Sequence, residues 1–187
     1  FGFQGDVQYR NWDLIGDLEQ LLFRGGLTYD AKAIPVKFTL GYAYVLSGEF
    51  GSNTNTSIEN RIYQEALIPQ KPGGRFHLNH RFRFEQRWVE KQDFRTRFRY
   101  GLFINVALNG TELTKGTFYY SFYNELFING EQDIGDGEEV SLFDRNRLYN
   151  AIGYCISDKL RFQGGYMYQI TDGVNKGQIQ LGLHHSF

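Results

Sequence analysis

From His80 to Gly101 the chain reads HRFRFEQRWVEKQDFRTRFRYG, in which charged or polar residues alternate with large apolar ones. Alternation with a period of two is typical of a β-strand that has one apolar and one polar face. The same pattern recurs along most of the chain, and helical periodicity is nearly absent. It predicts about ten strands, over residues 1–12, 18–29, 36–46, 61–68, 75–89, 94–108, 117–129, 145–156, 160–170 and 177–187.

The connections between these strands differ in length. Three are short, KPGG (71–74), EKQD (90–93) and SDK (157–159), whereas those over 47–59 and 130–144 are long and polar. Short turns at one end and long loops at the other are typical of outer-membrane barrels, although EKQD is short at the end expected to carry long loops. We therefore expect an all-β fold, one up-and-down antiparallel transmembrane β-barrel domain over residues 1–187. About ten strands are covered, and 10–12 in full if a strand or a signal peptide lies upstream.

The composition excludes several classes of protein. A net charge of −1 gives no basic surface for nucleic acid, and the single Cys155 excludes an intramolecular disulfide framework. No apolar run of about 18 residues is present, so no transmembrane helix is expected. A membrane protein is not excluded, because a transmembrane strand needs only about ten residues, half of them apolar.

Alternation does not decide which face points inward, because soluble and membrane barrels have opposite arrangements. Two observations favour an outward apolar face. Large rings such as Phe82, Phe84 and Trp88 recur on every strand and would overpack a small barrel interior. The arginines opposite them would form an unneutralised stripe on the outside, but inside they can meet carboxylates. A soluble antiparallel barrel or sandwich is the alternative.

Five stretches carry a resemblance to a known family: ENRIYQEALI (59–68), HRFRFEQRW (80–88), FYNELFIN (122–129), FDRNRLYNAIGY (143–154) and IQLGLHHSF (179–187). On them the chain resembles an uncharacterised family of small bacterial outer-membrane β-barrel proteins that carries only a domain-of-unknown-function label. The resemblance implies the fold and a location in the cell outer membrane of a Gram-negative bacterium. It implies no activity and no catalytic residue. The aromatic chain end, Phe187, is the outer-membrane assembly signal expected of such proteins.

The polar faces predict a charge network inside the barrel: Arg81, Arg83, Glu85, Arg87, Arg95, Arg97, Arg99, Glu65, Glu125, Arg147 and Arg161. Planar guanidinium groups make paired contacts with carboxylates, so this network would fill a narrow lumen. The apolar faces predict a lipid-facing aromatic girdle: Phe82, Phe84, Trp88, Phe98, Tyr100, Tyr166, Tyr168 and Phe187. A slip of one residue in a strand would exchange its two faces.

The expected role is non-enzymatic: a small porin-like barrel acting as a structural or accessory component, docked to a larger outer-membrane complex. The expected partners are outer-membrane lipid and lipopolysaccharide, the barrel-assembly machinery through the C-terminal strand, and another outer-membrane protein. No nucleic acid and no cofactor are expected. Because arginines outnumber carboxylates on the polar face, a narrow anion-selective passage or an anion-binding lumen is the alternative. A lipid-active enzyme is a third possibility.

Catalytic and metal sites were sought among the hydroxyl, imidazole and acidic residues. A lipid hydrolase would need a serine beside a histidine, but no spacing selects Ser121 or Ser186. Adjacent His184 and His185 point to opposite faces of a strand and cannot easily share a metal. The acidic segment DIGDGEE (133–139) lacks the ligand series of a calcium loop. We expect no catalytic residue and no metal.

Overall fold

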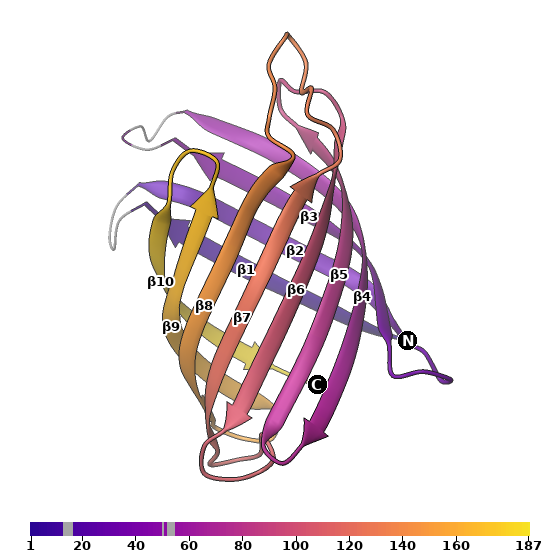
Figure 1. Cartoon of the computed structure of the whole chain (residues 1–187), viewed down its shortest axis with the longest axis vertical. Coiled ribbons are helices and arrows are strands. Elements are labelled where there is room, and N and C mark those ends of the chain that lie inside the picture. The colour runs from indigo at the N-terminus through magenta and orange to yellow at the C-terminus, as the bar shows by residue number, and fades with distance from the viewer. Residues whose placement is uncertain (13–16, 50, 52–54) are drawn as a thin grey trace. The chain divides into compact units, whose positions relative to one another are not determined.

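The computed structural model describes residues 1–12, 17–49, 51 and 55–187. It confirms the all-β, up-and-down fold: ten strands form one sheet, each paired with its neighbours in the chain (Figure 1). The registers are antiparallel, as between β1 and β2 or β8 and β9. The strands are β1 (Gly2–Asn11), β2 (Leu18–Asp30), β3 (Lys37–Gly48), β4 (Thr56–Gly73), β5 (Phe76–Val89), β6 (Arg95–Ala107), β7 (Phe118–Asn129), β8 (Phe143–Cys155), β9 (Leu160–Thr171) and β10 (Lys176–His185).

The chain divides into two compact units. Unit 1 comprises Phe1–Ala66, Arg83–Phe98 and Asn129–Leu142, and unit 2 comprises Leu67–Phe82, Arg99–Ile128 and Phe143–Phe187. The strands β4, β5 and β6 therefore contribute residues to both units. No helix in the described part of the chain is long and apolar enough to span a membrane.

Burial alternates along the strands, which gives the sheet a buried face and an exposed face. On β3, Thr39, Ala43 and Val45 are buried, whereas Phe38 and Leu40 are exposed. Successive side chains of a strand point to opposite faces, so the alternation in the sequence becomes an alternation in burial. The unusual feature is that the exposed side chains of β3 are the larger and more apolar ones.

Strand β4 is longer than the sequence predicts. The expected strand covered residues 61–68 and ended before Pro69, whereas β4 runs from Thr56 to Gly73. Proline removes one donor from the ladder, but its fixed φ is compatible with extended backbone, so Pro69 does not end the strand. The start of β4 is tied to the end of β5, where Glu90 N donates to Ile58 O at 2.9 Å. Part of the long loop predicted over 47–59 is therefore strand, and residues 50 and 52–54 of that loop lie outside the described residues.

The second long connection, residues 130–144, folds into a small hydrogen-bonded loop whose acidic side chains between residues 131 and 139 are exposed. Asp133 and Glu139 form an isolated antiparallel bridge, and Ile134 within it is buried. The Ile134 carbonyl accepts from Asp93 N at 2.8 Å, which joins the loop to the β5–β6 turn. Asp136 has a φ of 54°, in the left-handed region that Asp tolerates better than most residues.

Two glycines on the buried face lie directly beneath tyrosine rings. In unit 1, Gly41 of β3 lies under Tyr63 of β4, and in unit 2, Gly153 of β8 lies under Tyr119 of β7. A Cβ atom at either glycine would overlap the ring. Both tyrosines are buried, so the rings have little room to move aside. The missing side chain at each glycine thus lets a large ring lie flat on the neighbouring strand.

Candidate functional site

The candidate site is the buried face of the sheet, which carries ion pairs in each unit. In unit 1, Arg83 donates from Nε to Glu65 Oε2 at 2.7 Å and also from Nη2 to the same oxygen. Arg97 donates to Glu85 Oε2 from Nε at 2.8 Å and from Nη2 at 2.6 Å. The Arg83 guanidinium also lies 4.3 Å from the centre of the Tyr63 ring, a cation–π contact. The structure thus brings together four of the residues selected from the sequence.

A second cluster in unit 1 contains two residues that sequence analysis missed. Glu59 accepts hydrogen bonds from Arg61 Nε at 2.6 Å and Arg61 Nη2 at 2.7 Å, and from Arg87 Nε at 2.5 Å. Glu59 lies before the expected strand, which began at residue 61, and Arg61 at its first position was not selected. The signal was present, since Glu59, Arg61, Tyr63 and Glu65 are spaced by two. Following this alternation back from Glu65 to residue 59 would have found both residues.

Strand β1 adds a less buried ion pair to unit 1. Arg24 Nε donates to Asp6 Oδ1 at 2.5 Å, and these residues are direct partners in the β1–β2 register. Gln4 Nε2 donates to Glu65 Oε1 at 3.2 Å. Arg24 was not among the predicted residues, because alternation along residues 18–29 is irregular.

In unit 2, Glu125 is the centre of the charge cluster. Its Oε1 accepts from Arg81 Nη2 at 2.6 Å and from Arg99 Nε at 2.9 Å and Nη2 at 2.6 Å. The guanidiniums of Arg99 and Arg147 lie 4.3 and 5.1 Å from the centre of the Phe127 ring. Two arginines therefore share one carboxylate. The uncharged Phe127 ring makes cation–π contacts with guanidinium groups but cannot neutralise their charge.

The remaining predicted residues of the buried face make other contacts. Arg147 Nε donates to Gln169 Oε1 at 2.8 Å. Arg95 is buried, and Arg161 is half-buried without an ion pair to a described carboxylate. Tyr119 and Tyr149 are connected through Gln163, whose amide accepts from the first hydroxyl at 3.2 Å and donates to the second at 3.0 Å.

The exposed face carries the aromatic side chains that the sequence placed opposite the arginines. Neighbouring strands present them as pairs, with ring centres 5.1 Å apart for Phe82 and Tyr100 and 4.9 Å apart for Phe84 and Phe98. Phe84 is half-exposed; the exposed ones are Phe82, Trp88, Phe98, Tyr100, Tyr166, Tyr168 and Phe187. The most exposed of those within strands, Phe98, presents 53% of its surface.

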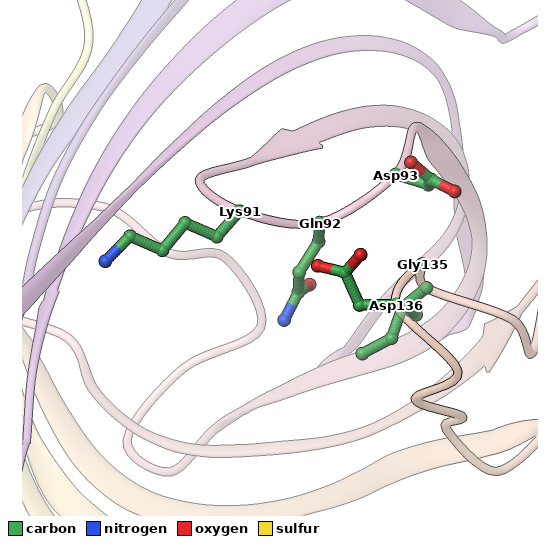
Figure 2. Close-up of a pocket in the computed structure, with 6 residues that line it drawn as sticks. Lys91, Gln92, Asp93, Gly135 and Asp136 are labelled. Carbon is green, nitrogen blue, oxygen red and sulfur yellow. The ribbon is translucent and has the colours of Figure 1, made fainter.

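A pocket of about 400 Å³ lies where the β5–β6 turn meets the loop over 130–144. Figure 2 shows its lining, in which Lys91 extends away from Asp136. It contains none of the charged residues of the buried face. In the described ranges, no group of three or more His, Cys, Asp or Glu side chains is placed to hold a metal ion.

One electrostatic effect involves the exposed connection between β6 and β7. Glu112, in the β6–β7 connection, pairs with Lys71 near the end of β4. The hydrogen bond from the Lys71 ammonium holds the pKa of the Glu112 carboxyl below its ordinary value. Both side chains are exposed, so solvent screens this pair strongly.

Comparison with curated proteins gives no match, and comparison with solved structures gives none either. A family model described as a protein of unknown function, DUF2490, matches residues 1–180. This range includes every charged residue of the buried face described above. Because the match covers nearly the whole chain, the protein belongs to the DUF2490 family.

Proposed function

We propose that this protein is an integral outer-membrane β-barrel without enzymatic activity, which acts as a structural or accessory component of that membrane. The observation that carries the proposal is that the sheet has charged side chains on its buried face and apolar side chains on its exposed face. In the described part of the chain, six arginines and four glutamates are buried: Arg61, Arg83, Arg87, Arg95, Arg97, Arg99, Glu59, Glu65, Glu85 and Glu125. The exposed large side chains that alternate with them are Ile62, Phe82, Trp88, Phe98 and Tyr100.

This arrangement of buried charges and exposed apolar side chains is costly for a protein surrounded by water. Each large ring left exposed forgoes roughly 25 cal/mol for every Å² of apolar surface, and each buried charge loses its hydration. In a bilayer the rings contact hydrocarbon, and the charged face lines a narrow interior where water can remain. Both costs fall, so the membrane is the environment in which the sheet is stable.

The interior network would have a structural role in this setting. Each carboxylate that accepts from two guanidiniums joins neighbouring strands, as Glu125 does for Arg81 on β5 and Arg99 on β6. The expected contacts are outer-membrane lipid and lipopolysaccharide outside the sheet, and the barrel-assembly machinery at β10. A larger outer-membrane complex is the partner to which such an accessory barrel would dock.

The first test is the dependence of folding on a membrane-like medium. In detergent or lipid vesicles the purified chain is expected to show β-type circular dichroism. Heated and unheated samples are expected to migrate differently on a gel. Phe98→Lys should destabilise the folded state by about 2–4 kcal/mol in vesicles, as a cation on a lipid-facing strand does. Thr114→Lys, in the exposed β6–β7 connection, is the matched control and should have no effect.

Two results would overturn the proposal. The first is a folded, monodisperse protein in buffer without detergent, in which Phe98→Lys is as stable as the wild type. The second is hydrolysis of outer-membrane lipid by the purified protein that is lost on replacing a single serine or histidine. The docking partner is sought by gentle solubilisation of the membrane and identification of co-purifying proteins.

A further inference from the structure

The buried charges of unit 1 do not balance. Among the residues of unit 1 that the structure describes, the buried face contains five arginines and three glutamates: Arg61, Arg83, Arg87, Arg95, Arg97, Glu59, Glu65 and Glu85. The nearby Arg24 and Asp6 form a neutral pair and do not change the difference. Buried charge is expensive unless it is paired, so a buried arginine that has only part of a carboxylate calls for further counter-charge.

The carboxylates of unit 1 are shared unequally among these arginines. Glu59 accepts from both nitrogens of the Arg61 fork, and Arg87 reaches the same carboxylate with its Nε alone. Glu85 is held by the fork of Arg97 at 2.6 and 2.8 Å. Arg61 thus binds both oxygens of Glu59, Arg97 donates two hydrogen bonds to one oxygen of Glu85, and Arg87 donates a single bond to Glu59.

Arg87 is 5% exposed, so its charge is almost fully withdrawn from bulk solvent. The contacts of its guanidinium in the described structure are accounted for by the Nε bond to Glu59, so its two terminal amino groups donate to no described residue. These amino groups carry four N–H donors. Arg87 is also subject to the positive charges of Arg97 and Arg61, which act on it from the same face.

We propose that the terminal amino groups of Arg87, with the adjacent cations Arg61 and Arg97, bind a small tetrahedral oxyanion of the phosphate or sulfate class. The planar fork of a guanidinium matches two oxygens of such an ion. An ion of charge −1 to −2 also matches the excess charge of the buried face. The site lies within unit 1, so the proposal depends on the fold of that unit and not on the membrane.

The test is a titration of the purified full-length chain with inorganic phosphate, at constant pH and at an ionic strength held constant with sodium chloride. Isothermal titration calorimetry should show saturable binding, and the melting temperature should rise with phosphate. Sulfate should compete, whereas chloride at the same ionic strength should not. Detergent is present if folding requires it and is omitted otherwise, so failure of the membrane proposal leaves this test intact.

Arg87→Gln removes the four donors and one charge, and we expect the phosphate dissociation constant to rise at least about tenfold. Lys37→Gln is the matched control: it removes one positive charge from the same unit, at an exposed pair with Asp30, and should leave the constant unchanged. Arg87→Lys keeps the charge but loses the fork and should bind phosphate with intermediate affinity. It also serves as the test variant if Arg87→Gln does not fold.

The proposal is overturned if the wild type shows no saturable response to phosphate beyond that to chloride. It is equally overturned if Arg87→Gln, or Arg87→Lys in its place, binds phosphate as tightly as Lys37→Gln does.

Discussion

Replacing Glu125 by glutamine tests whether the shared carboxylates stabilise the sheet. The change keeps the size of the side chain and one oxygen, but removes the charge that three hydrogen bonds from Arg81 and Arg99 require. A hydrogen bond to a charged group contributes about 1.5–3 kcal/mol, and a neutral one about 1 kcal/mol. Three such exchanges cost about 3 kcal/mol, which agrees with the about 3–5 kcal/mol lost when one partner of a buried pair is removed.

Urea unfolding of the protein refolded into detergent or vesicles measures this loss, with tryptophan fluorescence as the signal. Glu138→Gln, in the exposed loop over 130–144, is the control for loss of one negative charge. Replacing Arg81 by glutamine in the Glu125→Gln background should then cost less than it does in the wild type, because the two residues no longer attract. A Glu125→Gln variant within about 1 kcal/mol of the wild type would refute the structural role of the pair.

Two further predictions concern packing and charge. Gly41→Ala places a methyl group where the Tyr63 ring lies and should lower the free energy of unfolding by about 1–3 kcal/mol. Gly173→Ala, where a Cβ meets open space, should leave the stability unchanged. Equal stability of the two variants would contradict the close contact between Gly41 and Tyr63. The Lys71–Glu112 pair should stabilise the fold above the pKa of an unfolded glutamate and lose this contribution as the pH falls through the lowered pKa of Glu112. An NMR titration should show a lower Glu112 pKa in the wild type than in Lys71→Gln, and identical titration curves would count against the pair.

The strands were predictable because their signal is local. A run such as Arg95 to Tyr100 carries its own periodicity, and every second residue is buried as that periodicity requires. Along β2 the bounds were predicted correctly, although irregular alternation hid Arg24. Strand bounds were least predictable where a proline suggested the end of a strand. Pro69 is such a case: the loss of one donor was read as the end of β4, but neighbouring strands keep the backbone extended.

The candidate site was predictable as a face of the sheet but not as a set of contacts. The phase of each strand selected residues such as Arg83 and Glu65 correctly as members of one face, because their spacing within a strand is two. It could not show that Glu59 serves both Arg61 and Arg87, since that depends on which strands are neighbours and on their register. The register is set by turns and by packing over the whole sheet.

The number of strands, their order and the two faces of each strand could thus be predicted from the amino-acid sequence, because they follow from a period of two and from the connections between successive strands. Only the folded sheet shows which arginine meets which carboxylate, and that Glu59 and Glu125 are each shared by two arginines. It also decided that the 130–144 loop lies against the β5–β6 turn and that Tyr63 covers Gly41. These features depend on distances between residues far apart in the chain, and only the packed sheet brings such residues together.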